Sequence, residues 1–273
     1  MFATNFTTSG NQRNIVSETQ KNYRKANITL TKTRIAGFIL KFTEPNFLQS
    51  TKSNVFHFTN INYFRTMESE EKRGVKDPHE IMQVHALNPE TDKVRLTFKG
   101  HPCSTEIDQP HGTFTLNYGM TNHLSICSFV FLNIQTDFIK NSKNEFRIKS
   151  SVITDLIDQF GNRPAILWGG GDFKKLTSNL NVKENTILEV YSGLVNYYSG
   201  SNFSLFDKKI TPKNIFKIAF KKEEYFKSQR EFRLVAYTEK ENFDFDLKST
   251  VTAENDSLKV SNSRELADFY AKL

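Results

Sequence analysis

The sequence predicts an α+β fold with a mixed, largely antiparallel β-sheet core and a few peripheral helices. Several short segments alternate apolar and polar residues, as in Val94, Leu96 and Phe98, and this alternation is typical of half-buried strands. The segment 123–132 is instead apolar almost throughout, which predicts a central strand buried on both faces. Few segments have helical spacing, and these are short.

The elements follow in chain order. Strands are expected at 34–43, 55–58, 81–87, 93–99, 113–118, 123–132, 164–168, 187–197, 214–221, 231–237 and 243–247. Helices are expected from a cap at Thr59 or Asn60 to Gly74, over 151–160 before Gly161, from Asp172 after a tight turn at the three glycines 169–171, and over 263–272. Residues 223–230 are expected to form a loop or a helical turn.

The domain organisation predicted from the sequence is simple. Residues 1–26 are polar and are expected to form a loosely ordered N-terminal arm. Residues 27–273 show neither an internal repeat nor a linker, so we expect them to form a single domain. The 25 phenylalanines are spread along the chain, which fits a β-rich core filled by large aromatic side chains.

The composition is that of a globular protein with a moderate positive charge. Hydrophobic residues make up 37% of the chain and charged residues 25%, and the net charge is +7. Such an excess favours anionic partners, among them nucleic acid, nucleotides and acidic protein surfaces, without selecting one. The basic residues mostly alternate with apolar ones, as in 93–99. This pattern favours the solvent faces of strands over a dedicated nucleic-acid stripe.

A cytoplasmic location is expected. No run of about 18 apolar residues is present, so no membrane contact is predicted, and the N-terminus lacks the apolar core of a secretory signal. Cys103 and Cys127 are the only cysteines and do not form a Cys-x-x-Cys pair. The six histidines lack the spacing of a strong zinc motif, so no metal site is expected.

Two sequence motifs are candidates for chemistry, and the first surrounds His57. A strand that ends near His57 is followed by Thr59 and Asn60 and then by an amphipathic helix. A helix that begins directly after a strand in this way places the histidine beside the free backbone amides of the helix N-terminus. Such amides are a favourable binding position for a nucleotide or phosphate. The alternative is that His57 is a hydrogen-bonded core histidine and that Thr59 and Asn60 only cap the helix.

The second motif lies at the head of the predicted strand 231–237. Gln229, Glu231 and Arg233 are each two residues apart, so their side chains point to the same face of an extended strand. Three polar side chains on one face of an otherwise apolar strand indicate a functional site. The outer face of an edge strand would explain them without a function.

Together, and in their order along the chain, these motifs resemble the short sequence motifs of ADP-ribosyltransferases. The resemblance rests on His57, on the strand containing Ser125 and Ser128, and on Gln229-Arg-Glu231. Two departures are visible: the middle strand has Ser-Ile-Cys-Ser instead of Ser-Thr-Ser, and His57 stands where an arginine usually accompanies Gln-x-Glu. The chain also resembles uncharacterised bacterial and phage-associated proteins with a late Glu-Phe-Arg-Leu-Val strand.

The resemblance implies NAD as the co-substrate. It implies that Glu231 stabilises an oxocarbenium-like transition state while Gln229 orients the acceptor, and that NAD is held by a set of five residues, His57, Tyr63, Arg65, Arg73 and Ser125. Ser125 and Ser128 lie three apart, so they cannot face the same side of a strand without a bulge.

The function implied is the transfer of ADP-ribose to a macromolecular acceptor, either protein or nucleic acid, by a toxin or phage-conflict effector. One alternative is a non-enzymatic binding or inhibitor protein that docks a basic, aromatic-rich face on nucleic acid or on an acidic protein partner. Another is a structural or assembly protein of a virus. An enzyme is expected to gather Gln229, Glu231 and His57 in one pocket, whereas a binding protein does not need that convergence.

Overall fold

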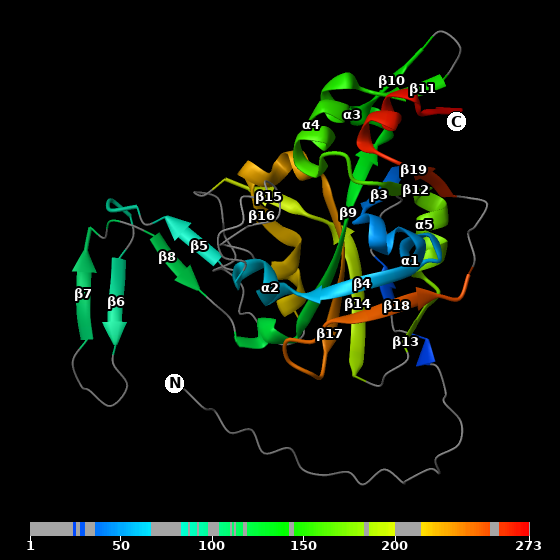
Figure 1. Ribbon diagram of the computed structural model, residues 1–273. Coiled ribbons are helices and arrows are strands. Elements are labelled where there is room, and N and C mark those ends of the chain that lie inside the picture. Colours follow the sequence, from blue (N-terminus) through cyan, green and yellow to red (C-terminus); the bar gives the residue numbers. More distant parts are fainter. Residues whose placement is uncertain are drawn as a thin grey trace, which may run out of the picture.

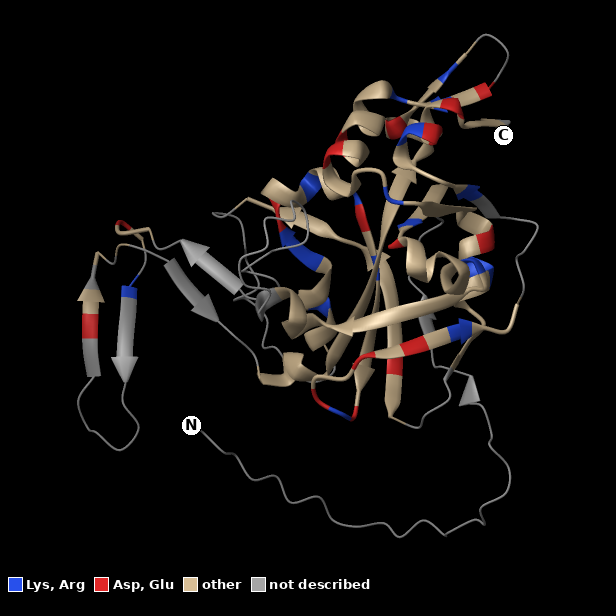
Figure 2. Ribbon diagram, in the orientation of Figure 1, with Lys and Arg blue, Asp and Glu red and all other residues tan. Residues whose placement is uncertain are grey.

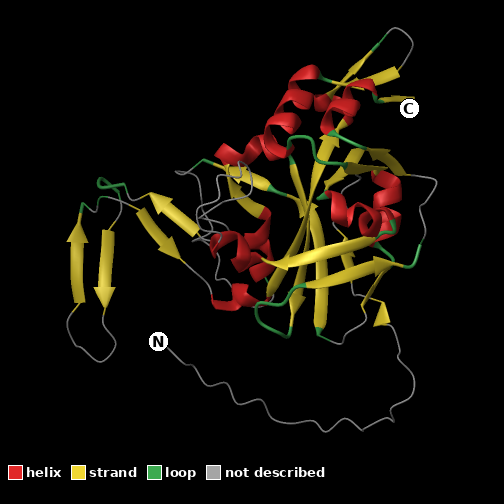
Figure 3. Cartoon of the chain, viewed as in Figure 1, coloured by secondary structure: helices red, strands yellow, loops and turns green. Residues whose placement is uncertain are grey.

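The structure is a computed structural model. It describes residues 24–25, 28–30, 36–66, 83–86, 88–91, 93–97, 104–109, 111, 113–116, 119–141, 145–182, 186–199, 214–251 and 257–272. The chain has an α+β fold in which short helices surround a curled and mostly antiparallel sheet, as Figures 1 and 3 show. The predicted fold class is therefore confirmed.

The elements are short except for a few central strands. The strands are β1 (Arg24–Lys25), β2 (Ile28–Leu30), β3 (Gly37–Phe42), β4 (Val55–Asn60), β5 (Gln83–Ala86), β6 (Lys93–Thr97), β7 (Ser104–Asp108), β8 (Thr113–Leu116), β9 (Leu124–Asn133), β10 (Phe138–Lys140), β11 (Glu145–Ile148), β12 (Ala165–Gly169), β13 (Leu180–Val182), β14 (Ile187–Leu194), β15 (Asn196–Tyr198), β16 (Lys221–Glu223), β17 (Glu231–Thr238), β18 (Phe245–Ser249), β19 (Ser257–Val260) and β20 (Tyr270–Lys272). The α-helices are α1 (Leu48–Lys52), α2 (Ile61–Thr66), α3 (Ile134–Asp137), α4 (Ser150–Phe160) and α5 (Gly170–Thr177). The 3-10 helices are η1 (Pro45–Phe47), η2 (Gly119–His123), η3 (Ile215–Phe220), η4 (Glu224–Gln229) and η5 (Ser263–Asp268).

The main sheet contains 11 strands, with β9 and β17 as neighbours at its centre. One path through it runs β1-β13-β18-β4-β9-β17-β14-β2, and a branch of β3, β12 and β19 leaves this path at β9. Among the described strands, β14 with β2 and β15 with β16 are the parallel pairs. The two hairpin-like sheets β5–β8 and β6–β7 extend away from the main sheet (Figure 1).

The sheet divides at β9, which is the strand predicted to be buried on both faces. Along one edge, β17 pairs with β9 from Leu124 to Val130. Along the other edge, β4 pairs with the beginning of β9 and β3 with its end. Neither of these two ladders includes residues 127–129. At this fork the Lys41 ammonium donates a hydrogen bond of 2.8 Å to the Ser128 carbonyl oxygen.

One face of the sheet carries an aromatic core around Phe173 of α5. Phe173 contributes a fully buried ring, and four rings pack against it with centroids 4.8 to 6.3 Å away, from Phe56, Phe129, Trp168 and Phe232. Edge-to-face contacts of this kind add to the effect of burying apolar area. The predicted role of the abundant phenylalanines in the core is confirmed for these residues.

The opposite face carries two separate apolar clusters. Side chains alternate along a strand, so Ile126, Ser128 and Val130 of β9 turn away from the Phe173 core. Ile126 belongs to a cluster that includes Ile61 of α2 and Ile218 of η3. Val130 belongs to a second cluster, which includes residues of α4 and η5. Ser128 therefore lies on the strip between the two clusters.

The predicted strand 214–221 is wrong, because residues 215–220 form the 3-10 helix η3. Ile215, Ile218 and Ala219 are its buried residues. Their spacings of three and four place them on one side of a helical turn. A short apolar run is compatible with either structure, and packing against the sheet decided in favour of the helix.

Three other expectations need correction. The predicted helix 263–272 is shorter, because the 3-10 helix η5 ends at Asp268. The residues after it form strand β20, which pairs with β11. The three glycines do not form a separate turn, since α5 begins at Gly170. The predicted strand 187–197 is divided into β14 and β15 at Val195. By contrast, the helix before Gly161 is confirmed, and that glycine has a φ of 60°, which favours a residue without a Cβ.

Charged residues of both signs are interspersed along the described elements, as Figure 2 shows. This arrangement fits the expected solvent-exposed faces of strands. Among the described residues, no helix has the length and apolar character needed to cross a membrane. Arg24 and Lys25 form a strand paired with β13, while the rest of the expected N-terminal arm, 1–23 and 26, lies outside the described residues.

Phe173→Ala is expected to lower the free energy of unfolding by about 3–5 kcal/mol, because it leaves a cavity at the centre of the aromatic core. Urea unfolding measures the change. Phe47→Ala serves as the control, because this ring is 62% exposed and its loss should change stability by about 0.5 kcal/mol or less. Equal effects of the two substitutions would contradict the packing described above.

Candidate functional site

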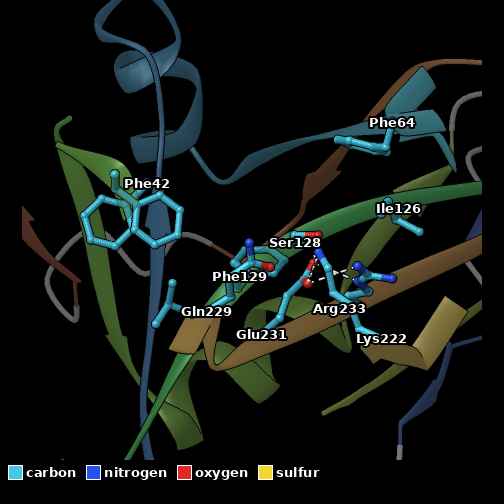
Figure 4. Close-up of a pocket in the computed structure, with 11 residues that line it drawn as sticks. Phe42, Phe64, Ile126, Ser128, Phe129, Lys222, Gln229, Glu231 and Arg233 are labelled. Carbon is cyan, nitrogen blue, oxygen red and sulfur yellow. Dashed lines mark hydrogen bonds and ion pairs between the residues drawn. The ribbon is translucent and has the colours of Figure 1, made fainter. Parts of the chain in front are cut away.

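A cavity of about 150 Å³ opens on the strip between the two apolar clusters. It is lined by residues from seven elements of the fold, namely Phe42, Phe64, Ile126, Ser128, Phe129, Val130, Phe160, Lys222, Gln229, Glu231 and Arg233. Figure 4 shows the charged side chains gathered at one end and Phe42 at the other. The cavity therefore has a polar half, on whose side Phe64 and Ile126 also lie, and an apolar half around Phe42.

Glu231 is the centre of the polar half. Arg233 donates to both of its carboxylate oxygens, from Nε to Oε1 at 2.7 Å and from Nη2 to Oε2 at 3.0 Å. The Ser128 hydroxyl also donates to Oε1, and Lys222 Nζ lies 3.3 Å from Oε2. Each oxygen thus accepts two hydrogen bonds, which matches the acceptor capacity of an ionised carboxylate.

These charged groups are almost completely withdrawn from solvent. Glu231 is 8% exposed, Lys222 5% and Arg233 1%. Burial by itself raises the pKa of the Glu231 carboxyl, but the charges of Arg233 and Lys222 and the hydrogen bonds from Arg233 and Ser128 outweigh it and hold the pKa well below its ordinary value. Glu231 is therefore ionised throughout the physiological pH range and is unsuited to act as a general acid or base.

Arg230 has a left-handed backbone conformation and lies between Gln229 and Glu231, whose side chains line the same cavity. Gln229 ends η4 and Glu231 begins β17, while Arg230 between them has φ 48° and ψ 44°. The two side chains were expected to share one face of an extended strand. Both do line the same cavity, but Gln229 reaches it from the end of a helical turn.

Side chains of α3 and α4 hold Arg230 in this conformation. Its guanidinium lies 3.0 Å from Asp155 Oδ2 and 3.4 Å from Asp137 Oδ1, and it donates to the Ser228 carbonyl oxygen at 2.9 Å. The left-handed region costs a residue with a Cβ about 1–2 kcal/mol. These contacts offset that cost and fix the turn that leads into Glu231.

The strand that carries Glu231 is not at an edge. β17 lies between β9 and β14 and pairs with both along most of its length. Phe232, Leu234 and Ala236 belong to the Phe173 core, as the alternation predicted. The outer face of an edge strand therefore does not explain the polar residues Glu231 and Arg233.

Two aromatic rings line the apolar half of the cavity. The rings of Phe42 in β3 and Phe160 in α4 are stacked, with centroids 4.3 Å apart and planes inclined by 6°. At the polar end, Lys222 Nζ also lies 4.7 Å from the centroid of the Phe226 ring, a favourable cation–π position. A cavity of this volume can accommodate one small ring, so a dinucleotide could place only one part inside it.

His57 and Tyr63 do not line the cavity. The His57 side chain is 59% exposed and its Nδ1 lies 2.8 Å from Oδ1 of Asp246 on the neighbouring strand β18. Tyr63 is 52% exposed; its neighbour Phe64 is the α2 residue at the cavity. The structure thus brings Gln229 and Glu231 together but does not place His57 with them. Asn60 caps α2 as expected, because its Oδ1 accepts from the Asn62 amide at 3.0 Å.

Of the two serines on β9, Ser128 lies at the site. The Ser125 hydroxyl donates to the Phe243 carbonyl oxygen at 2.6 Å and is buried, and Ser125 is not part of the cavity wall. The remaining candidates are Arg65, whose side chain lies outside the described residues, and Arg73, which lies outside them entirely.

Sequence reasoning missed Lys222, Phe42 and Phe160. The expected strand 214–221 ended one residue before Lys222, and no local pattern indicated that this lysine would meet a carboxylate nine residues later. The two phenylalanines were assigned only to core elements. Among the described residues, no group of His, Cys, Asp and Glu side chains could hold a metal ion.

No family model, curated protein or solved structure matches this chain. The functional argument therefore rests on the geometry and electrostatics of the cavity.

The pH dependence of stability should depend on Glu231. The pKa of this group is lower in the folded state, so its contribution to stability is present above the unfolded-state pKa and is lost as the pH falls towards the folded-state pKa. Between about pH 4.5 and pH 2, the free energy of unfolding of Glu231→Gln should therefore fall less steeply than that of the wild type. Urea unfolding at a series of pH values measures both slopes, and parallel slopes would contradict the assignment.

The left-handed turn can be tested with a matched pair of substitutions. Arg230→Ala and Arg230→Gly remove the same ionic contacts, but glycine adopts a positive φ without steric cost. We expect Arg230→Ala to be less stable than Arg230→Gly by about 1 kcal/mol. Chemical denaturation of the two variants gives this difference directly. An alanine variant as stable as the glycine variant would show that the positive φ carries no such cost.

Proposed function

We propose that the chain is a cytoplasmic enzyme that transfers ADP-ribose from NAD to a macromolecular acceptor, with Glu231 at the reacting centre. The observation that supports this proposal is the convergence of Gln229 and Glu231 with Ser128 in one partly apolar cavity. The resemblance to ADP-ribosyltransferases rested on His57, on the strand with Ser125 and Ser128, and on Gln229 and Glu231; of these, Ser128, Gln229 and Glu231 line the cavity. A merely structural sheet position does not require a cavity beside them.

An ionised and buried carboxylate suits this chemistry. Cleavage of the bond between nicotinamide and ribose develops positive charge on the ribose, and nicotinamide leaves with the bonding electron pair as a neutral molecule. A carboxylate that remains ionised can stabilise the developing charge without transferring a proton. Because Glu231 is already oriented by Arg233 and Ser128, little reorganisation is needed during the reaction.

The contact from Lys222 to Glu231 is the longest in the network that holds the carboxylate, at 3.3 Å. In the proposal a ribose hydroxyl replaces Lys222 at Oε2, which leaves the bidentate pairing with Arg233 intact. Gln229 orients the acceptor from the other side of the cavity. Since the cavity holds one small group, most of the dinucleotide binds outside it. His57, Tyr63 and Ser125 have no role at this cavity in the proposal.

The second candidate function is that of a non-enzymatic binding or inhibitor protein. The observation that favours it is the saturation of Glu231 by four hydrogen bonds, because a fully satisfied buried network is also found at purely structural positions. The exposed position of His57 favours it too. In this alternative the positive charge of the chain attracts nucleic acid or an acidic protein, and the binding weakens steeply with salt.

Incubation of the pure protein with labelled NAD and a cell lysate tests the proposal. We expect nicotinamide release and transfer of label, and we expect Glu231→Gln to lower the rate by about 10²–10³-fold, as for the loss of one preorganised electrostatic group. The identity of the labelled species would show whether the acceptor is a protein or a nucleic acid.

Glu224→Gln provides the matched control. Glu224 lies on η4 close to the cavity, but its side chain is 55% exposed and pairs with Lys227, so turnover should not change. Circular dichroism would establish that both variants are folded. If the wild type releases no nicotinamide while the fold is intact, the transferase proposal is wrong and the binding protein becomes the better description.

A further inference from the structure

A small three-stranded sheet is held firmly on the body of the protein. It consists of β10, β11 and β20, with β11 in the middle, and in Figure 1 β10 and β11 lie near the C-terminus. On its inner face Phe138 and Ile148 are each 5% exposed and belong to the apolar cluster that includes residues of α4 and η5. No described residue of these strands lines the cavity. The outer face is therefore a separate and well-supported surface.

The outer face of this sheet carries a row of three side chains. The strand register aligns Ile139 with Arg147 and Arg147 with Tyr270. Residues directly opposite each other in antiparallel strands place their side chains on the same face. Ile139 is 56% exposed and Tyr270 is 55% exposed, and Arg147 is exposed as well. An arginine therefore lies between two large side chains that both remain in contact with water.

Arg147 has no counter-ion within the described part of the chain, where its guanidinium forms neither a hydrogen bond nor an ion pair. Glu145 lies two residues earlier on the same strand, but its carboxylate accepts a hydrogen bond of 2.8 Å from the Asn141 amide. Arg163 and Arg230, by contrast, each lie 3.0 Å from a carboxylate oxygen. Arginine and tyrosine are enriched among the residues that contribute most to binding between proteins. An exposed and unpaired guanidinium favours a partner that brings a carboxylate.

The spacing of the row matches an α-helix better than an extended strand. Neighbouring strands lie about 4.7–4.9 Å apart, so the two ends of the row are separated by about 9.5 Å. Positions i, i+4 and i+7 lie on one face of a helix and span about 10.5 Å along its axis. Positions i, i+2 and i+4 of an extended strand span about 13 Å. A helix that crosses the three strands can therefore place one side chain against each residue of the row.

Two other occupants fit this face less well. A two-fold axis through the row would place Arg147 against the same arginine of a second copy of the chain, and the two like charges would repel each other. Nucleic acid binds mainly through several phosphate contacts, whereas this row offers one cation between two apolar surfaces. Both features favour a protein partner with a single, centrally placed carboxylate.

We infer that the outer face of β10, β11 and β20 binds an amphipathic helix of a partner protein, which presents one carboxylate between two apolar side chains. The carboxylate pairs with Arg147, and the apolar side chains pack on Ile139 and Tyr270. The inference does not rest on the proposed function, because it uses no residue of the cavity and no step of NAD cleavage. Either of the two candidate functions can use such a surface.

Synthetic helical peptides test the inference on the full-length wild-type chain. Two alanine-based peptides carry leucine at positions i and i+7, and at i+4 one has glutamate and the other glutamine. In NMR titrations we expect the glutamate peptide to shift the signals of the Ile139 methyl groups and the Tyr270 ring. We expect it to bind about fivefold more tightly than the glutamine peptide, because Arg147 attracts only the charged side chain. A third peptide, with the leucines moved to the opposite helix face, should not bind.

Arg147→Gln should abolish the difference in affinity between the glutamate and glutamine peptides. Arg163→Gln is the matched control, because it removes a surface cation that already pairs with Glu44, and it should leave the difference unchanged. Circular dichroism would establish that both variants are folded. The comparison of the two peptides on the wild-type chain remains decisive if a variant does not fold.

The inference is overturned if the glutamate peptide leaves the Ile139 and Tyr270 signals unshifted, or if the glutamine peptide binds as tightly. Displacement of the glutamate peptide by a single-stranded oligonucleotide would also overturn it, since nucleic acid would then be the better occupant. Sedimentation of a wild-type dimer that Ile139→Asp dissociates would do the same in favour of a second copy. None of these outcomes bears on nicotinamide release, so this inference and the transferase proposal can fail separately.

Discussion

The pairing of Glu231 with Arg233 in a central strand is the interaction on which the rest of the site depends. Removing either charge from water costs several kcal/mol, and an isolated buried ion is not tolerated. The two residues are adjacent on one face of β17, so each supplies the other's counter-ion at 2.7 Å. Their remaining hydrogen-bonding positions must also be filled. This requirement explains why Ser128, Lys222 and the Ala219 carbonyl oxygen converge on the same point.

The space beside this pair follows from the fork in the sheet. β4 and β3 both pair with β9, but at opposite ends of it. The helices that cover this face follow the two branches, with α2 and η3 over the Ile126 cluster and α4 and η5 over the Val130 cluster. A continuous apolar layer would have covered Ser128 and Glu231. The separation of the two clusters instead leaves these residues facing a cavity.

The cavity contains a buried carboxylate whose two oxygens are held by Arg233, Ser128 and Lys222. These contacts favour its ionised form. Such a carboxylate can stabilise a cation that develops next to it, without transferring a proton. The transferase proposal uses this property.

The local pattern of apolar and polar residues was enough to predict, from the sequence alone, the faces of strands, a buried strand and the end of a helix. The alternation of β17 separated Glu231 and Arg233 from Phe232 and Leu234, and the apolar run of β9 marked a strand buried on both faces. Gly161 marked the end of α4. These features depend on near neighbours in the chain, and side-chain direction repeats every two residues in a strand and about every 3.6 in a helix.

Only the tertiary structure decided which of these side chains meet. Ser128 lines the cavity and Ser125, which was expected to hold NAD, does not. His57 was directed to Asp246 on β18 instead. Lys222, Phe42 and Phe160 joined the site from β16, β3 and α4. Contacts of this kind depend on which strands pair and how helices pack over them, and that information is distributed over the whole chain, so no short motif contains it.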